Sequence, residues 1–286
     1  MRLRERMRGA WTRLRGLGPR MVRFLAYARF SKKRVAVLLL ASVVLAACGA
    51  VGVAWITCPA VDSLIAGNPA TTSLIARRQR QGKAPRRLPP LNRTFVPLKA
   101  IPEPLQQAVI VAEDAGFYGH AGIDWYEVRQ AFKQNLHQGR VVRGASTITQ
   151  QLAKNLYLSE ERSAFRKLQE WILAGRLEGA LSKRRILELY LNVIEFGPGV
   201  FGIGPACRSF FGKAPAELSL PEMVRLAAVI PEPLRLAPHR RSDRLVKRAR
   251  IILERLLRFG YINHEAFASA GASLDTFLGT ETEVNP

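Results

Sequence analysis

The chain has few cysteines and histidines, and their scarcity excludes several kinds of site. Its 286 residues include only three cysteines, Cys48, Cys58 and Cys207, and four histidines. No C-x-x-C pair is present, and the histidines are scattered along the sequence. The sequence therefore predicts neither a disulfide framework nor a metal centre with cysteine or histidine ligands.

Several catalytic motifs are missing as well. The sequence contains no G-x-S-x-G, no H-E-x-x-H and no P-loop, so it does not indicate a serine hydrolase, a zinc peptidase or a nucleotide hydrolase. It has no S-x-x-K or K-T-G, and we expect no penicillin-binding transpeptidase domain. Residues 197–202 do spell G-x-G-x-x-G, but no good strand precedes them, and Pro198 and Pro205 oppose a following helix. A dinucleotide fold is therefore not expected.

Acidic residues are half as numerous as basic ones. The chain has 22 Asp and Glu against 44 Lys and Arg, for a net charge of +22. Residues 1–34 alone hold twelve basic residues and one acidic residue, which is half of the excess. Such a charge favours anionic partners, among them phospholipid, diphosphates and nucleic acid.

A long uncharged run over residues 35–57 follows this basic segment. Its 23 residues are about the number that a helix needs to cross a hydrocarbon core. Because Lys32, Lys33 and Arg34 precede the run, the positive-inside rule places the N-terminus in the cytoplasm and the remainder of the chain on the outer face. We therefore expect a basic cytoplasmic tail over 1–34 and a transmembrane anchor over 35–57.

Three other interpretations of this region were weighed against the anchor. A cleaved signal peptide has a shorter apolar core than this run. The four residues that end at Cys48 resemble a lipobox, but the apolar run continues past them to Thr57. A basic tail could bind DNA, yet positive charge beside a span is what orientation in the membrane requires. We expect no nucleic-acid partner.

The composition changes again beyond the apolar run. Residues 58–94 are basic and rich in helix breakers, which predicts a linker or juxtamembrane segment, either solvated or held near anionic headgroups. Residues 95–286 predict one mainly α domain without convincing strands. The first helix should end at Glu113, and an S-x-x-E box at Ser219 should open a later one. Further helices are expected over 124–137, 146–157, 163–181, 183–192 and 243–259, with Gly260 ending the last.

The first motif with chemical character begins at the end of a helix. Glu113 would lie near the negative end of the helix dipole, which raises the pKa of a carboxyl group. Asp114 beside it would point about 100° away. Phe117 offers an apolar wall that could desolvate the carboxylate, and His120 could orient a carboxylate or carry a proton. A lone Glu-Asp pair usually marks a solvated helix end, but this pattern suits a general base.

Two more polar stretches follow. Thr147, Gln150, Gln151 and Lys154 share one face of a helix, where hydroxyl and amide groups suit a sugar and an ammonium suits a phosphate. Residues 161–170 then add cations at 162, 166 and 167 that could compensate a diphosphate, although such charge runs more often form a solvated helix face.

Together these stretches resemble the bacterial peptidoglycan glycosyltransferases (glycosyltransferase family 51), and most closely the short monofunctional biosynthetic transglycosylases. The matching patterns are E-D-x-x-F-x-x-H-x-G from Glu113, G-A-S-T-I-T-Q-Q from Gly144, R-K-x-x-E from Arg166 and K-x-x-I-L-E-x-Y-L-N from Lys183. The resemblance covers about residues 95–240. It implies a mainly α, lysozyme-like domain with two lobes around a cleft, behind a single N-terminal transmembrane helix.

The resemblance also implies roles for individual residues. Glu113 matches the catalytic base that takes the proton from the acceptor's sugar 4-hydroxyl. Glu170 matches a second essential carboxylate that orients the leaving group or its metal. In the fourth pattern, Glu188, Tyr190 and Asn192 would support the cleft. The residues implied to bind substrate or its pyrophosphate are Asp114, Phe117, His120, Ser146, Thr147, Gln150, Gln151, Lys154, Asn155, Arg162, Arg166 and Lys167.

The implied reaction is inverting polymerisation of lipid II into glycan strands, with release of polyprenyl pyrophosphate, as part of cell-wall synthesis. No cofactor is required, although a divalent cation, Mg²⁺ or Mn²⁺, could sit at the pyrophosphate; no metal ligands are assigned. The implied partners are lipid II, lipid-linked glycan, membrane lipid and other cell-wall synthases. The implied location is the bacterial inner membrane, with the catalytic domain on the periplasmic face and an apolar surface near 123–142 that dips into the bilayer.

The sequence differs from the family pattern at two positions, and two alternative functions remain open. Gly204 stands where family members often have an acidic residue, and Phe210-Phe211 stands where Tyr-Phe is common, so local packing should differ there. A lytic enzyme of the same fold class would cleave glycan, but it needs no pyrophosphate site. A non-enzymatic basic membrane protein would bind wall components or nucleic acid without turnover.

Overall fold

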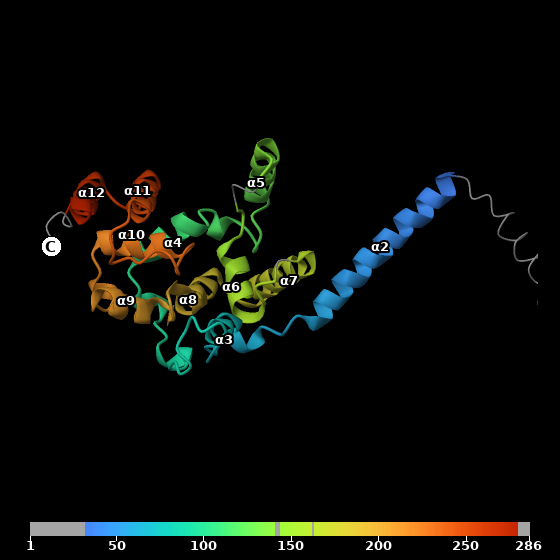
Figure 1. Ribbon diagram of the computed structural model, residues 1–286, viewed down its shortest axis with the longest axis horizontal. Coiled ribbons are helices and arrows are strands. Elements are labelled where there is room, and N and C mark those ends of the chain that lie inside the picture. Colours follow the sequence, from blue (N-terminus) through green and yellow to red (C-terminus); the bar gives the residue numbers. More distant parts are fainter. Residues whose placement is uncertain (1–31, 141–143, 162, 280–286) are drawn as a thin grey trace, which may run out of the picture. The chain divides into compact units, whose positions relative to one another are not determined.

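The computed structural model describes residues 32–140, 144–161 and 163–279 (Figure 1). The chain divides into two units, Met1–Val53 and Ala54–Pro286, which we describe separately. Most of helix α2 (Lys32–Thr57) belongs to the first unit. Its stretch Lys33–Thr57 has a mean hydropathy of 2.6 and is long and apolar enough to cross a membrane. This composition supports membrane anchoring, as the sequence predicted.

The second unit is mainly α, which confirms the predicted fold class. Its described helices are α3 (Ser73–Arg80), α4 (Glu103–Glu113), α5 (Trp125–Gln138), α6 (Ile148–Tyr157), α7 (Ala164–Ala180), α8 (Lys183–Val193), α9 (Ile203–Phe211), α10 (Leu220–Val229), α11 (Asp243–Arg258) and α12 (His264–Gly279). Short 3₁₀ turns occupy Asp62–Leu64, Leu91–Arg93, Leu98–Ala100, Phe117–Gly119 and Pro215–Glu217. The strands β1 (Glu195–Gly197) and β2 (Val200–Phe201) form one antiparallel hairpin.

Helix α6 lies at the centre of one group of helices, because it packs against α3, α7 and α8. A second group forms around α10, which packs against α4, α11 and α12 (Figure 1). The apolar sides of both groups belong to one buried core, in which the largest fully buried side chains include Tyr190, Phe117 and Phe196. Burial of this apolar surface is the main stabilising contribution to the fold.

Side-chain caps explain why several helices begin where the sequence predicts. Thr147, Ser163 and Ser182 are the N-caps of α6, α7 and α8, and each accepts a hydrogen bond from the backbone N–H three residues later. The predicted box at Ser219 is also present, since the Glu222 carboxylate accepts the Ser219 N–H at 2.8 Å. Gly260 follows the end of α11 with φ +74°, as expected of a glycine at this position.

The segment before residue 95 is not the solvated linker that its composition predicted. Val61, Leu64, Leu74 and Leu91 are buried in the main core, and α3 packs against α6. The apolar positions of α3 lie among arginines, and this high charge concealed a packed helix. Residues 58–94 therefore contribute to the folded domain, while the predicted outer limits of the domains stay predictions.

The glycine-rich region also differs from expectation. Residues 195–201 form the hairpin, and α9 begins at Ile203 although Pro205 lies in its first turn. Proline is tolerated there because the first N–H groups of a helix have no partner within it. The two departures from the family pattern lie at closely packed positions, and the expected difference in packing from other family members stays a prediction. A Cβ on Gly204 would lie 2.7 Å from Val96 Cγ2, and one on Gly197 would lie 2.6 Å from Phe210 Cζ.

Candidate active site

Glu113 is the last residue of α4 and takes part in a chain of hydrogen bonds. Gln151 on α6 donates from Nε2 to Glu113 Oε2 at 2.8 Å. The Gln151 Oε1 accepts from the hydroxyl of the fully buried Tyr190 at 3.0 Å. The Tyr190 hydroxyl orients the side-chain amide of Gln151, and this amide in turn orients the Glu113 carboxylate.

Burial raises the pKa of Glu113 above its ordinary value. The hydrogen bond from Gln151 opposes this shift, as do the positive charges of Arg248 and Lys154. A carboxylate with a raised pKa that remains within reach of solvent suits a general base, because its affinity for a proton is increased.

Asp114 has a different environment from its neighbour. It is buried, and its Oδ2 accepts the backbone N–H of Ile148, the first residue of α6, at 2.9 Å. His120 Nε2 lies 3.0 Å from Asp114 Oδ1, and His120 Nδ1 accepts the Gly122 N–H at 3.2 Å. Because Nδ1 accepts, Nε2 is the ring nitrogen that donates to Asp114. Asp114 thus anchors the start of α6 beside Glu113.

Thr147 and Gln150 are bonded to the start of α6 itself. The Thr147 Oγ1 accepts the Gln150 N–H at 3.2 Å, and the Gln150 Oε1 accepts the Thr147 N–H at 3.1 Å. Thr147 Oγ1 also donates to the Gly122 carbonyl at 2.6 Å. Both side chains are buried. The sequence predicted a substrate-facing row here. Gln150 instead supports the site from within through this capping box, whereas Thr147 forms the other half of the box and also lines the cavity beside Glu113.

A cavity of about 570 Å³, here called the Glu113 cavity, opens beside this carboxylate. Arg255 and Arg258 of α11 line it together with Glu113 and Tyr126. Arg255 Nη1 donates to the carbonyl of Val111 in the last turn of α4 at 2.6 Å. A cation at this end of a helix stabilises the free carbonyls and holds the turn that carries Glu113.

A second cavity of about 580 Å³, here called the Lys154 cavity, has a cationic lining. Arg77, Arg78, Lys154 and Arg166 provide its positive charges. Burial lowers the pKa of Lys154; the charges of Arg166, Arg77 and Lys167 act in the same direction, and Glu170 opposes them. So many cations around one cavity indicate a binding site for a polyanion.

Glu170 on α7 is buried between two cations. Arg166 Nη1 lies 2.6 Å from its Oε2, and Lys167 Nζ contacts its Oε1. Lys167 also lies 3.4 Å from the hydroxyl of the exposed Ser146. Glu170 therefore fixes the positions of two predicted phosphate ligands, and Lys167 and Ser146 are brought together.

A hydrogen bond links the linings of the two cavities. Gln151 lines the Lys154 cavity and donates to Glu113, which lines the other cavity. A carboxylate with a raised pKa is thus bonded directly to the lining of a cationic cavity. Asn155 lines the Lys154 cavity as well, whereas Phe117 is fully buried, with Lys183 Nζ 4.5 Å from its ring centroid. The predicted ligand Arg162 lies outside the described residues.

One group of three potential metal ligands occurs in the described part of the chain: Asp114, His120 and Asp124 lie within 4.8 Å of one another. All three side chains make hydrogen bonds within the protein. Asp124 caps α5 by accepting the Glu127 N–H, and Asp114 is hydrogen-bonded to His120 and to the Ile148 N–H at the start of α6. These bonds explain the cluster without a cation. The cluster also differs from the position at Glu170 that the resemblance implied for a metal.

The sequence analysis missed several cationic residues of the site. Arg77 and Arg78 lay in the expected linker, and Arg248 and Arg255 lay on a helix that was considered only for its apolar stripe. The spacing of Arg248 and Arg255, one heptad apart, places both on one face of α11 and could have revealed them. The expected supporting residues are confirmed: Asn192 bonds both backbone groups of Val96, and Tyr190 holds Gln151.

The chain is similar to known proteins over more than half of its length. The family model described as Transglycosylase matches residues 81–257. The chain is 46% identical over 166 residues to a biosynthetic peptidoglycan transglycosylase of Methylobacillus flagellatus, covering 58% of this chain and 72% of the relative. It is 44% identical over 191 residues to a protein of the same description from Herminiimonas arsenicoxydans, covering 66% and 82%. A protein of that description from Nitrosomonas eutropha is 49% identical over 166 residues, covering 58% and 68%.

Among solved structures, penicillin-binding protein 1A from Haemophilus influenzae matches at 22% identity with a TM-score of 0.34, covering 62% of this chain and 17% of that one. So low a score supports no conclusion. The family match and the relatives, by contrast, confirm the family resemblance seen in the sequence and the function of a peptidoglycan glycosyltransferase in cell-wall synthesis. The chain belongs to the transglycosylase family.

Proposed function

We propose that the chain polymerises lipid II and that Glu113 is the general base. The donor's diphosphate occupies the Lys154 cavity, and the acceptor sugar lies in the Glu113 cavity. The observation that carries this proposal is the hydrogen bond from Gln151, which joins the Glu113 carboxylate to the lining of the Lys154 cavity. Lipid II and lipid-linked glycan are the substrate class that fits a sugar diphosphate site in this family.

The proposed step balances as an inverting displacement. The acceptor's 4-hydroxyl oxygen forms a bond to the donor's anomeric carbon, and its proton passes to Glu113. The bond from that carbon to the phosphate oxygen breaks, and its electron pair leaves with the polyprenyl diphosphate. Lys154 and Arg166 compensate the growing negative charge, while Glu170 holds Arg166 in place. Arg162 and a divalent cation belong to the same proposal on the strength of the family pattern.

The proposal is tested by incubating the detergent-solubilised full chain with labelled lipid II. Glycan strands should form, and lipid-free glycan given to the same protein should remain intact. Degradation of that glycan would instead identify a lytic enzyme. Tight binding of lipid II without turnover, unaffected by Glu113→Gln, would identify a non-enzymatic scaffold.

The rate of polymerisation should depend on pH with two limbs. Glu113 must be ionised to accept a proton, and its pKa is raised by burial, so the rising limb should lie above 4.5, the ordinary value. Lys154 must keep its proton, and its pKa is lowered by burial, so the falling limb should lie below 10.5. Initial rates at saturating lipid II would locate both. Lys154→Arg keeps its charge and should move the falling limb to higher pH; a rising limb at or below pH 4.5 would contradict the assignment of Glu113.

Helix α5 offers a surface for the lipid part of the substrate. Figure 1 shows α5 standing apart from the helix groups of the core. Trp125, Tyr126, Phe132 and Leu136 expose 61%, 68%, 68% and 73% of their surface. An exposed apolar face of this kind fits insertion into the headgroup region of a bilayer. With α2 as anchor, we propose an inner-membrane protein whose domain lies on the periplasmic face, where it would meet other cell-wall synthases.

Removal of this apolar surface should impair substrate capture. In the full chain placed in lipid nanodiscs, Phe132→Ser with Leu136→Ser should raise KM for lipid II several-fold and leave kcat almost unchanged. Ile251→Ser is the matched control, because Ile251 is an exposed apolar residue on α11, 40% exposed. An equal change in both proteins would mean that α5 has no particular role in binding lipid.

A further inference from the structure

Helix α3 brings two arginines into the Lys154 cavity from outside the matched catalytic motifs. The helix ends at Arg80, before residue 81, where the family match begins. Arg77 and Arg78 both line the cavity, and their side chains are only 11% and 12% exposed. A buried arginine remains charged, so each needs an anionic partner.

Arg78 already has a buried partner. Its Nε lies 2.7 Å from Oε2 of Glu195 at the start of the β hairpin, and the Glu195 side chain is only 3% exposed. A buried, directly bonded pair of this kind is a fixed part of the structure, because removal of either member leaves the other charge without compensation. Arg78 therefore has a mainly structural task.

Arg77 has a weaker and more accessible partner. Its Nε lies 3.0 Å from Oε1 of Glu160, whose side chain is 47% exposed. Arg77 Nε and Nη1 are both buried, and neither makes a hydrogen bond within the described ranges, so the contact with Glu160 is an ion pair alone. Glu160 lies in the connection between α6 and α7, so its carboxylate can move to water without disturbing a helix. An ion pair this exposed contributes little stability.

The charges that line the cavity indicate which kind of ligand could take the place of the Glu160 carboxylate beside Arg77. The four cationic side chains of the lining face two carboxylates, and one of those, Glu195, is bonded to Arg78. Glu160 is therefore the remaining anion of the lining, and it contacts Arg77, Arg78 and Gln81 as a phosphate oxygen would. The planar fork of an arginine suits two phosphate oxygens at once.

We propose that Arg77 binds the diphosphate of the donor and that the Glu160 carboxylate occupies this arginine until the donor arrives. The inference rests on the proposed function, since it assigns a further ligand to the same substrate. It predicts competition: the donor must displace Glu160, so loss of the Glu160 charge strengthens binding and loss of Arg77 weakens it.

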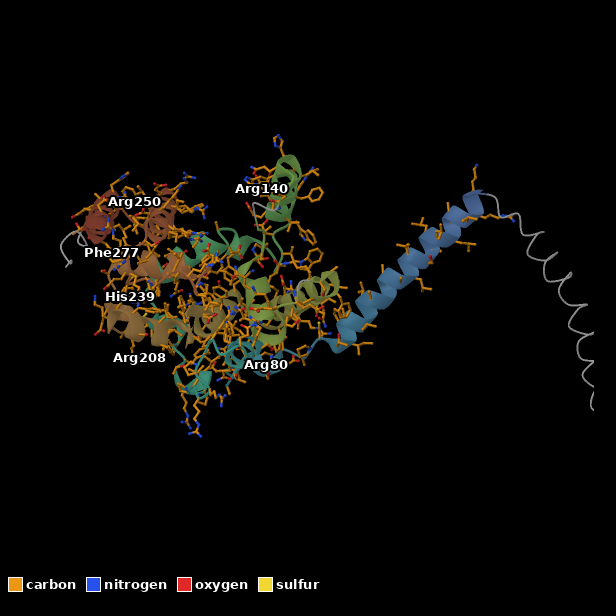
Figure 2. The ribbon with its side chains drawn as sticks, viewed as in Figure 1. Arg80, Arg140, Arg208, His239, Arg250 and Phe277 are labelled. Atoms are coloured by element: carbon orange, nitrogen blue, oxygen red, sulfur yellow. The ribbon has the colours of Figure 1, made fainter. Side chains whose placement is uncertain are left out.

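The test measures binding of inorganic diphosphate to the full chain in detergent by titration calorimetry. Arg77→Gln should weaken binding about tenfold, the loss expected for one charge-assisted contact. Glu160→Gln should strengthen it several-fold, a gain that misfolding cannot produce. Arg80→Gln is the matched control, because Arg80, labelled in Figure 2, ends the same helix, is exposed and is not among the residues that line the cavity. This variant should bind diphosphate as the parent chain does.

A double variant distinguishes the contribution of Arg77 to diphosphate binding from that of Arg78. If Glu160 acts through Arg77, then Arg77→Gln with Glu160→Gln should bind diphosphate as weakly as Arg77→Gln alone. A gain that persists in the double variant would assign the competition to Arg78 and overturn the proposal. So would unchanged binding by Arg77→Gln.

The polymerisation assay distinguishes this inference from the proposed function. Arg77→Gln should raise KM for lipid II more than it lowers kcat. Polymerisation by a chain whose Arg77→Gln variant binds diphosphate normally would refute the role of Arg77 and leave the function intact. Weakened diphosphate binding in a chain that does not polymerise would refute the function and retain Arg77 as an anion ligand.

Discussion

Replacement of Glu113 by glutamine is expected to reduce glycan polymerisation by about 100-fold to 10,000-fold, the range for loss of a general base. The amide keeps the size of the side chain and can still accept the hydrogen bond from Gln151, but it cannot take up the acceptor's proton. Initial rates with labelled lipid II would measure the loss. Glu103→Gln is the matched control, because Glu103 is an exposed acid at the other end of α4.

The same substitution should stabilise the folded chain near neutral pH. Burial raises the folded pKa of Glu113, so the stabilising contribution of its protonated form is present below the unfolded pKa and is lost as the pH rises through the folded pKa. Glutamine mimics the protonated form at every pH. Thermal unfolding of Glu113→Gln should therefore occur at higher temperature than that of the parent near neutral pH, and the difference should vanish in acid. A less stable variant near neutral pH would mean that the site favours the ionised carboxylate.

Replacement of Lys154 by glutamine should lower kcat by about 100-fold to 1,000-fold, as the loss of one charge that stabilises a transition state does. Lys154 lies on α6, one turn beyond Gln151, and lines the cationic cavity. Its charge matters most as the diphosphate leaves, so kcat should fall more than KM rises. Initial rates over a range of lipid II concentrations would give both constants.

Two further variants frame this prediction. Lys247→Gln removes an exposed lysine of α11 that does not line either cavity, and its kcat should match the parent. Lys154→Arg keeps the charge and should retain more activity than Lys154→Gln. A kcat unchanged in Lys154→Gln would remove Lys154 from the leaving-group site and undermine the assignment of the cavity.

Local signals allowed much of the fold to be predicted from the sequence. The helices that begin after Ser163, Ser182 and Ser219 start at N-cap residues whose hydrogen-bond partners lie three positions later in the sequence. The position of Glu113 at the end of α4 follows from the spacing of the apolar residues before it. These features depend on neighbours in the chain, which a sequence displays directly. The order of the motifs also pointed to Glu113 and Arg166, which line the two cavities.

Other features depend on residues far apart in the sequence and could not be predicted. The bond from Arg78 to Glu195 joins positions 117 residues apart, and the bond from Arg255 to Val111 joins positions 144 apart. No local pattern specifies such pairs. Gln150 shows a second difficulty, because one sequence spacing is compatible with two structures. Residues three positions apart, such as Thr147 and Gln150, can share an exposed helix face or can bond to each other's backbone in a capping box, as they do here.

The protein is proposed to transfer glycosyl groups from a lipid diphosphate donor to a sugar hydroxyl, and Glu113 is proposed to take the proton of that hydroxyl. The most direct test of this claim follows both products of one reaction: polyprenyl diphosphate released and glycosidic bonds formed from labelled lipid II by the full chain in detergent. We predict one diphosphate for each bond, inversion at the donor's anomeric carbon, and neither product from Glu113→Gln. Diphosphate release without glycan, or equal glycan from Glu113→Gln, would contradict the claim.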